Sequence, residues 1–450
     1  MASPSPPPFA EAFHRGTDPY DHARAEIIWN KRLERRRSPD AIIRCTDAAE
    51  VAKAIQLAER EQVRVALRGS GHSYIAAPLR DEGLLLDLGA LNFVEINPST
   101  HIARVGPGAR GGDLIHALAE HGLGFPIGHC STVALGGYLL SGGIGWNCGA
   151  WGPACRYVRA VELVLADGRT VIATDTEHPD LLWAARGSGC GFFAAVTAYH
   201  LDLLPLPPTA RLWSQSFAIA SAPVLADWLS AATAAADPTA EIMCLVGPDL
   251  RSGEPSVTIR AVCTGDTREE AAAGIASFSG PPADATATGP AEERDLPFVE
   301  LTRLSAMPDG KRVAADQGWS EALMGELLLA VADLAAIPAS SSTINLVAPG
   351  GKGRLPHMVG LAGALSVGGT TSCGIYAMWD DPADDARHEA WVRAADNALA
   401  PFRTSRYVGE ADVQQPGHLA DCFTGDALTR IDQLRAKWDP AGRFHGWPNA

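Results

Sequence analysis

The sequence lacks any apolar run of about 18 residues, the length that a membrane-spanning helix needs. It also lacks a basic start followed by an apolar core, so we expect no secretory signal, and residues 1–13 predict a short disordered lead. Positive charge is scarce, because 37 Lys and Arg stand against 52 Asp and Glu, giving a net charge of −15. A protein this acidic has no general attraction for nucleic acid or anionic membranes, and we expect neither as a partner.

A regular cysteine pattern is also missing. The nine cysteines are scattered along the chain, are odd in number and include no Cys-x-x-Cys pair. This favours neither a disulfide framework nor a zinc site, and no metal is expected. Without an export signal, the reducing cytoplasm is the expected compartment. Most of the thiols should be buried and inert, and one of them could instead be reactive.

The length of 450 residues and the 46% hydrophobic content allow two or three domains. Residues 39–69 predict a strand, a helix and a second strand, and residues 93–108 and 158–174 each predict a hairpin. Residues 204–210 have the composition of a linker. Beyond it, longer strands are separated by alanine-rich helices, and residues 277–297 predict a surface loop.

One glycine motif is a weak lead. Residues 106–111, GPGARG, match the G-x-G-x-x-G pattern of dinucleotide-binding folds. However, no carboxylate lies in residues 125–135, where a ribose-binding acid is expected, and the preceding segment is a hairpin. We therefore expect no NAD site at this position.

Two other glycine-rich loops, residues 68–73 and 128–145, carry a stronger signal. Glycine lets backbone N–H groups approach a ligand, and successive N–H groups can surround a phosphate. Two such loops suit a large ligand with a pyrophosphate at one end and a ring system at the other. One loop carries His72 and the other Cys130. Both side chains can bond covalently to an electrophilic cofactor; the alternatives are a surface histidine and a small buried thiol.

The segments RGSGHS (68–73) and GHCSTVALGGYLLSGGIGW (128–146) resemble those of the berberine-bridge-enzyme-like FAD-linked oxidases, in the vanillyl-alcohol-oxidase/PCMH flavoprotein superfamily. The C-terminal KWDPAGRFHGWPN resembles that family's Tyr-Asp-Pro-x-x-x-Phe signature, with Trp438 in place of the tyrosine. The resemblance implies an α+β fold: a PCMH-type FAD-binding domain of two α/β subdomains (1–205), a substrate domain with an antiparallel sheet covered by helices (206–409), and a segment returning to the FAD domain (410–450).

The resemblance also implies roles for single residues. His72 would bond to the flavin 8α-methyl and Cys130 to ring carbon C6, so that FAD is attached twice. The residues implied to surround the pyrophosphate are Arg68, Gly69, Ser70, Gly71 and Ser73. Those implied to line the isoalloxazine and the diphosphate are Ser131, Thr132, Gly136, Gly137, Ser141, Gly142 and Gly145. Val196 matches a position at the adenine end, and Asn449 matches a C-terminal asparagine near the flavin.

The chain departs from the family at its expected catalytic positions. Tyr138 stands where many members have histidine, and in RYVGEAD (406–412) Glu410 replaces a tyrosine that often assists deprotonation. Glu410 could act as the base if burial raises its pKa, or could be a salt-bridged structural carboxylate. Tyr407 could hydrogen-bond substrate or flavin, or pack under the sheet. One face of the strand at 375–380 should line the substrate cavity, and the sequence leaves open which face.

The expected function is an FAD-dependent oxidase. A base would remove a proton from the substrate, a hydroxyl-bearing or amine-bearing carbon would give a hydride to the flavin, and O2 would be reduced to H2O2. The expected substrates are a sugar, an alcohol or a secondary metabolite, and the expected state is a monomer or homodimer. The alternatives are a dehydrogenase with another acceptor and a flavin-binding paralogue without turnover.

Overall fold

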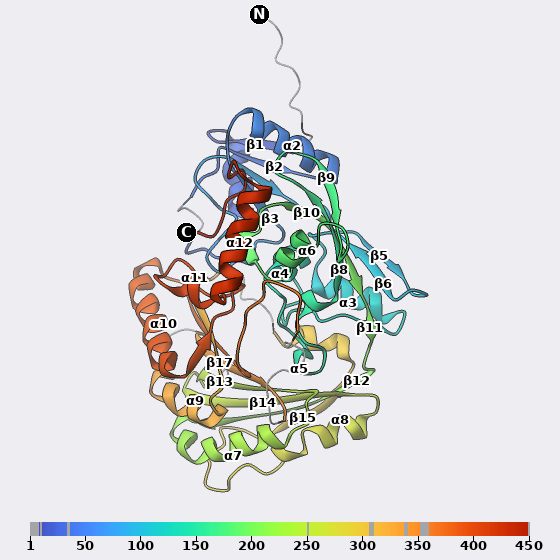
Figure 1. The fold of residues 1–450 in the computed structure, drawn as a ribbon. Helices are drawn as coiled ribbons and strands as arrows, with labels where there is room; N and C mark the ends of the chain where they lie inside the picture. Colours follow the sequence, from blue (N-terminus) through green and yellow to red (C-terminus); the bar gives the residue numbers. More distant parts are fainter. Residues whose placement is uncertain are drawn as a thin grey trace, which may run out of the picture.

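Three main sheets and the helices that cover them form the molecule (Figure 1). The computed structural model describes residues 9, 11–33, 37–249, 252–305, 310–336, 341–351 and 360–448. Two smaller sheets occupy the upper part of Figure 1, and an eight-stranded sheet occupies the lower part. This confirms the predicted α+β class. The boundaries predicted at residues 205 and 409 stay predictions.

The first sheet has four strands in the order β1 (Glu11–His14), β2 (Ala41–Arg44), β4 (Leu84–Asp87) and β3 (Val65–Arg68). The predicted strand, helix and strand are present, but β4 lies between β2 and β3 and is parallel to both. Strand β1 pairs antiparallel with β2. The predicted disordered lead is therefore wrong for residues 11–13, because their backbone groups are paired in the sheet; residues 1–8 and 10 lie outside the described part.

Helix α2 (Ala48–Arg60) shows why this part of the chain is helical. The side chain of Asp47 accepts a hydrogen bond from the backbone N–H of Glu50 and so caps the first turn. Val51, Ile55 and Ala58 recur at helical spacing and are buried against the sheet. On the other side of the sheet, α1 (Asp18–Glu26) covers a smaller core.

The second sheet has five antiparallel strands. They are, in spatial order, β5 (Val94–Asn97), β6 (Ile102–Val105), β10 (Ala195–Asp202), β8 (Val158–Val164) and β9 (Thr170–Ala173). Both predicted hairpins are present. The helices of this part are α3 (Gly111–Ala119), α4 (Leu135–Leu140), α5 (Cys148–Trp151) and α6 (Pro179–Ala185). The predicted linker is partly wrong, because β11 (Leu204–Pro205) pairs with β7 (Leu123–Gly124).

The third sheet is antiparallel throughout. Its strands are, in spatial order, β15 (Glu292–Leu296), β12 (Thr209–Ala218), β14 (Pro255–Gly265), β13 (Ala240–Pro248), β17 (Thr343–Pro349), β18 (Thr371–Trp379), β16 (Arg312–Ser320) and β19 (Arg403–Ser405). Strand β15 falls within the predicted loop at 277–297. Its sequence EERDL does not alternate as a half-buried strand does, because it forms the exposed edge of the sheet.

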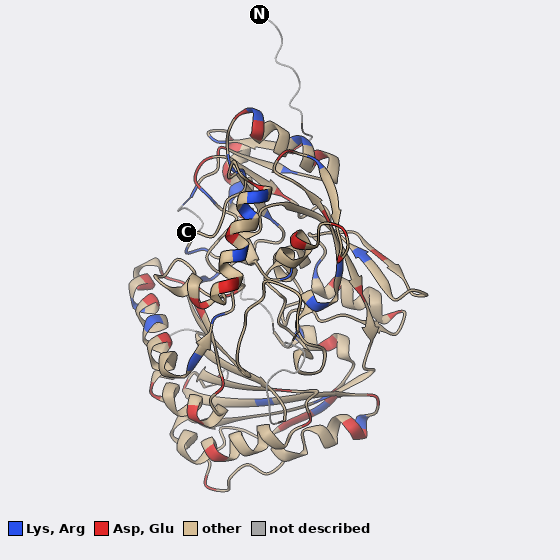
Figure 2. Cartoon of the chain, in the orientation of Figure 1, with Lys and Arg blue, Asp and Glu red and all other residues tan. Residues whose placement is uncertain are grey.

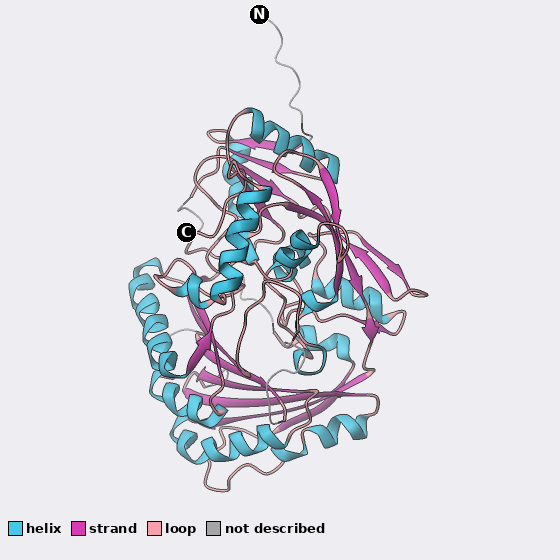
Figure 3. Ribbon diagram, in the orientation of Figure 1, coloured by secondary structure: helices cyan, strands magenta, loops and turns pink. Residues whose placement is uncertain are grey.

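Helices cover one face of this sheet, the lower face in Figure 3. They are α7 (Ala222–Ala235), α8 (Arg268–Gly274), α9 (Met324–Val331) and α10 (Asp385–Leu399). Alternation along β13 explains the layering: Ile242, Cys244 and Val246 pack in the core with these helices. The residues between them face the two upper sheets, so this face is available to a ligand.

The C-terminal segment packs back against the first sheet. It contains α11 (His418–Asp421) and α12 (Gly425–Trp438). The carboxylate of Asp439 accepts hydrogen bonds from the backbone N–H groups of Arg443 and Phe444 and forms a tight turn. Phe444 then forms a parallel bridge with Val65 of β3. The segment that resembles the family signature therefore lies along β3, the edge strand of the first sheet.

Charged side chains of both signs lie along the outer helices α10 and α12 (Figure 2). Alternating charge of this kind is typical of a solvated helix face. No helix in the described ranges combines the length and the apolar sequence that crossing a bilayer requires.

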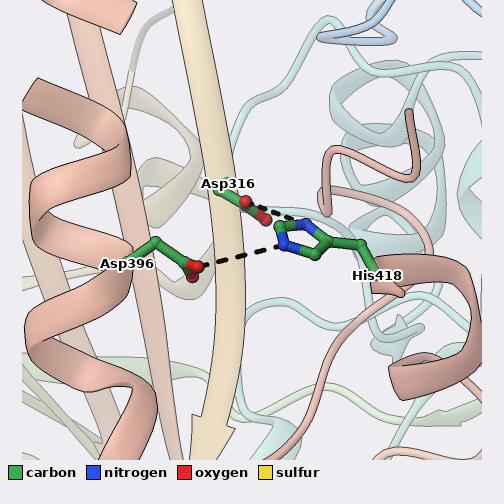
Figure 4. A group of neighbouring side chains, drawn as sticks. All are labelled: Asp316, Asp396 and His418. Carbon is green, nitrogen blue, oxygen red and sulfur yellow. Dashed lines mark ion pairs between the residues drawn. The ribbon is translucent and has the colours of Figure 1, made fainter. Parts of the chain in front are cut away.

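A buried ion-pair network joins the third sheet to the C-terminal segment. Asp316 of β16, Asp396 of α10 and His418 of α11 converge in Figure 4, with ion-pair distances of 3.2 and 4.0 Å from the imidazole to the two carboxylates. The same carboxylates bind the guanidinium of Arg406, which is only 1% exposed, at 2.9 Å. Because this guanidinium already engages both carboxylates, we interpret the group as structural.

We expect Arg406→Ala to lower the free energy of unfolding by about 3–5 kcal/mol, because it removes the guanidinium that binds both carboxylates and leaves buried Asp316 with only the imidazole of His418 as a partner. Denaturant unfolding followed by tryptophan fluorescence measures this change. The matched control is Arg294→Ala, which breaks an exposed pair with Glu292 and should cost about 0–1 kcal/mol. Equal effects of the two variants would contradict the network's role.

Candidate active site

One large cavity lies between the two upper sheets and the uncovered face of the third sheet. Its volume is about 630 Å³, within the usual range for small-molecule and cofactor sites. Both glycine-rich loops line it, together with side chains of β13, β17 and β18 and residues 407–411. Residues of both loops therefore line the same cavity.

The two candidate tethering residues are brought together by Thr132. Its hydroxyl lies 3.0 Å from Nε2 of His72 and 3.2 Å from Sγ of Cys130. Seven of the nine cysteines are buried, whereas Cys130 and Cys190 are accessible and line the cavity. An imidazole and a thiol from loops far apart in sequence thus reach the same part of one cavity.

Burial and the nearby Arg110 guanidinium lower the pKa of His72 to about 4. The ring is therefore neutral at physiological pH, and one of its nitrogens carries a free lone pair. Its neighbour Trp29 lies with its ring centroid 6.4 Å away. A neutral imidazole is the form that can attack an electrophilic carbon.

The backbone of the first loop faces the cavity. Within the described ranges, the N–H groups of Gly69, Ser70 and Gly71 donate no hydrogen bond, so they are available to an anion. Gly71 has a φ of +78°, and a Cβ there would lie 2.1 Å from the carbonyl oxygen of Ile27. Only glycine fits this position. Arg68 anchors the start of the loop through a 2.9 Å ion pair with Asp87.

Most of the predicted cofactor-binding residues line the cavity. They are Arg68, Gly69, Ser70, Gly71, His72, Ser73, Cys130, Gly136, Gly137, Ser141, Gly145 and Val196. Three predicted positions do not. Thr132 is exposed and contacts both tethering candidates, Ser131 packs against Gly112, and Gly142 faces Leu365. Asn449 lies outside the described residues.

The second loop turns back on itself, which explains why its predicted residues divide in this way. The backbone N–H of Trp146 donates to the carbonyl of Ile127, so the two ends of the loop run side by side. At Gly145 a Cβ would lie 2.1 Å from that same carbonyl oxygen. Because the two ends of this loop pack closely together, some of its residues face the cavity and the others face away from it.

Glu410 lies on the cavity wall and accepts a 2.6 Å hydrogen bond from the hydroxyl of Tyr376. Burial raises the pKa of Glu410, whereas the Tyr376 hydroxyl and the positive charge of His129 oppose that rise. The structure shows no ion pair between Glu410 and a described arginine or lysine. It is thus a buried carboxylate in the cavity, with a pKa shifted toward neutrality.

The two tyrosines named from the sequence have different surroundings. The hydroxyl of Tyr407 accepts a 3.1 Å hydrogen bond from the N–H of Gly143, and its pKa is raised by burial. The hydroxyl of Tyr138 donates to the carbonyl of Pro126 at 3.2 Å. Both rings line the cavity. Since the Tyr138 hydroxyl is held by the backbone, its side chain acts here as a wall.

The structure shows which face of strand β18 lines the cavity. Tyr376 and Met378 line it, whereas Ile375, Ala377 and Trp379 pack in the core beneath the helices. Tyr376 also contacts Tyr74 of the first loop region, with ring centroids 5.5 Å apart. This contact joins the third sheet to the loop that carries His72.

The pair of His129 and Glu241 on the cavity wall was not identified from the sequence. Nε2 of His129 lies 2.6 Å from a carboxylate oxygen of Glu241 on β13. Burial alone would lower the pKa of His129, but the Glu241 carboxylate outweighs it and raises that pKa. The ring of His129 also packs edge-on against Trp146 at 4.7 Å. The only indication of this pair in the sequence is the single acidic residue at the start of the apolar segment EIMCLVG.

The donor set fits the FAD that the sequence resemblance implies. Unpaired backbone N–H groups can bind phosphate oxygens, and a neutral imidazole and an accessible thiol stand beside them. The cavity joins these groups to a buried carboxylate on a different sheet. The arrangement can bind a flavin and place a substrate between it and Glu410.

Comparisons with known proteins agree with this interpretation. A family profile described as an FAD binding domain matches residues 39–174. The chain is 26% identical to the FAD-linked oxidoreductase nodO of Hypoxylon pulicicidum over 445 residues, covering 95% of this chain and 94% of that protein. It is 34% identical to (R)-6-hydroxynicotine oxidase of Paenarthrobacter nicotinovorans over 180 residues, covering 40% of this chain and 39% of that protein.

Solved structures share the whole fold. Crystalline 6-hydroxy-D-nicotine oxidase from Arthrobacter nicotinovorans has a TM-score of 0.83 at 24% identity, covering 98% of this chain and 97% of that chain. The wild-type BBE-like 1 protein of Physcomitrella patens has a TM-score of 0.85 at 20% identity, with the same coverage. The matched FAD-binding segment, a relative of nearly full length and this common architecture lead to one conclusion: the chain is an FAD-linked oxidoreductase with the fold of the BBE-like and 6-hydroxynicotine oxidase flavoproteins.

Proposed function

We propose that the chain holds FAD by two covalent bonds, one from His72 to the flavin 8α-methyl and one from Cys130 to ring carbon C6. The support is that Thr132 contacts both side chains in one cavity. The lowered pKa of His72 keeps its imidazole nucleophilic at neutral pH. The first loop would bind the pyrophosphate through the N–H groups of Gly69, Ser70 and Gly71.

We further propose that Glu410 is the general base of a substrate oxidation. The observation that carries this proposal is that one cavity contains both tethering candidates and a buried carboxylate with a raised pKa. A substrate hydroxyl or amine would give its proton to Glu410. When bound, FAD supplies a two-electron acceptor that takes a hydride from the adjacent carbon and passes the electrons to O2, giving H2O2.

Other side chains position the base and the substrate. Tyr376 donates to Glu410 and fixes the orientation of the carboxylate. Tyr407 is held by the Gly143 N–H, with its ring on the cavity wall. The apolar wall residues Met243, Leu245 and Met378 would exclude water from the reacting carbon.

The proposed substrates are small molecules with a hydroxyl-bearing or amine-bearing carbon: a sugar, an alcohol or a secondary metabolite. The relatives span both chemistries by name. One is a nicotine oxidase, and a structural neighbour, Phl p 4.0202, is described as a glucose dehydrogenase. A variant of Phl p 4 is described as a glucose oxidase, so the shared fold is compatible with either electron acceptor.

We expect the reduced holoenzyme to react rapidly with O2. Reduction by dithionite without air, followed by stopped-flow mixing with air-saturated buffer, should restore the oxidised flavin spectrum within seconds and release one H2O2 per flavin. Reoxidation over many minutes, together with fast reoxidation by a quinone or dye, would identify a dehydrogenase instead.

A further inference from the structure

Arg260 of β14 lies on the wall of the active-site cavity. Its Nε is buried and has no hydrogen-bond partner, and its guanidinium forms no ion pair with any described residue. Burial lowers its pKa. The residue as a whole is half-buried, and a partly desolvated guanidinium without a partner among the described residues is well placed to bind an anion.

Two carboxylates on the strands beside and beyond Arg260 already have other partners. Glu241 lies diagonally across from it on β13, because Met243 is the direct partner of Arg260 in the sheet. Such diagonal positions are roughly 7–8 Å apart. Glu241, however, binds His129 at 2.6 Å. Glu292, on the exposed edge strand, binds Arg294 at 3.2 Å. The charge of Glu292 acts on Arg260 from a distance, but neither carboxylate forms an ion pair with it.

The charged groups around Arg260 also favour an anionic ligand. The Glu241 carboxylate is bound by His129, whose pKa it raises, so it is not available to pair with Arg260. The phosphate-binding loop lies on the opposite wall, at the end of β3, and the neighbours of Arg260 in the sheet are Ser214 and Met243. The missing anion is thus better placed on the substrate than on the cofactor.

We propose that Arg260 binds a carboxylate group of the substrate and so selects anionic substrates for this site. A guanidinium can bind both oxygens of a carboxylate through two parallel hydrogen bonds, which gives orientation as well as affinity. The substrate carboxylate would lie against β14, one diagonal step from the His129–Glu241 pair, and the oxidised carbon would lie toward Glu410. This inference deepens the proposed function and rests on it.

The test compares acids with their neutral amides in the oxidised holoenzyme. The probes are benzoate, 3-phenylpropionate and 4-phenylbutyrate, each paired with its primary amide, and the readout is the change in flavin absorbance on titration. We expect at least one acid to bind 10-fold or more tightly than its amide, and Arg260→Met to abolish that difference. Arg260→Lys should retain part of it.

Arg294→Met is the matched control, because it removes the same charge from the exposed edge of the same sheet. It should leave the preference for acids intact. The proposal is overturned if no acid binds more tightly than its amide, or if Arg260→Met keeps the preference while its flavin content is normal. Because binding is measured without turnover, failure here is distinct from failure of Glu410 as the base, which would alter flavin reduction instead.

Discussion

Acid precipitation of the purified protein should carry the FAD into the pellet, because the two proposed covalent bonds to the chain would survive unfolding. His72→Ala should keep the flavin attached through Cys130, and Cys130→Ala should keep it attached through His72. Only the double variant should release all of its flavin into the supernatant. The measurement is the flavin absorbance of the pellet and the supernatant, expressed per mole of protein.

The matched control for the thiol is Cys190→Ala, because Cys190 is also accessible and lines the cavity. It should retain both bonds. Loss of all attachment in one single variant would show that only one residue is bonded to the flavin. Complete release from the wild-type protein would contradict both assignments. Measuring flavin bound before precipitation separates loss of a bond from loss of folding.

Glu410→Gln should slow flavin reduction by about 10²–10⁴-fold, the usual contribution of a general base. Glutamine keeps the size and one acceptor oxygen but cannot take a proton. Anaerobic stopped-flow reduction with any substrate found in a screen of alcohols and amines measures the rate directly. Glu241→Gln is the comparison, because Glu241 is another carboxylate on the cavity wall. A larger loss in Glu241→Gln would contradict the assignment of the base.

The pH dependence of reduction should follow the protonation of Glu410. Its carboxylate is active when ionised, so the rate should rise with pH through a pKa above that of an ordinary glutamate, since burial raises the pKa. The Tyr376 hydroxyl donates to the ionised form and opposes this rise. Tyr376→Phe should therefore move the acid limb of the profile to higher pH. An unchanged limb would place the titrating group elsewhere.

Local sequence was sufficient to predict the segments that have one clear period or one turn. The hairpins at 93–108 and 158–174, helix α2 and the long strands of the third sheet are all present. The order of strands was not predictable in this way, since β4 inserts between β2 and β3 through contacts distant in sequence. Strand β15 was missed because a charged edge strand looks like a loop.

The same distinction applies to the candidate site: single residues were predictable from the sequence, whereas the contacts between them were not. Resemblance of two loops identified His72 and Cys130, but the Thr132 hydroxyl that contacts both depends on how the loops fold together. Pairing of Tyr376 with Glu410 depends on strand register and on the path of residues 407–411. In the sequence, Glu241 and Arg260 are each a single charged residue in an apolar strand. Such a residue points to a site only when the structure shows that its side of the strand faces the cavity.

The central claim is that one flavin is bonded to both glycine-rich loops. Mass spectrometry of a proteolytic digest of the denatured wild-type protein tests it most directly. We predict one cross-linked species in which a single FAD joins the peptide containing His72 to the peptide containing Cys130. Recovery of both peptides unmodified, with FAD free in solution, would contradict the claim.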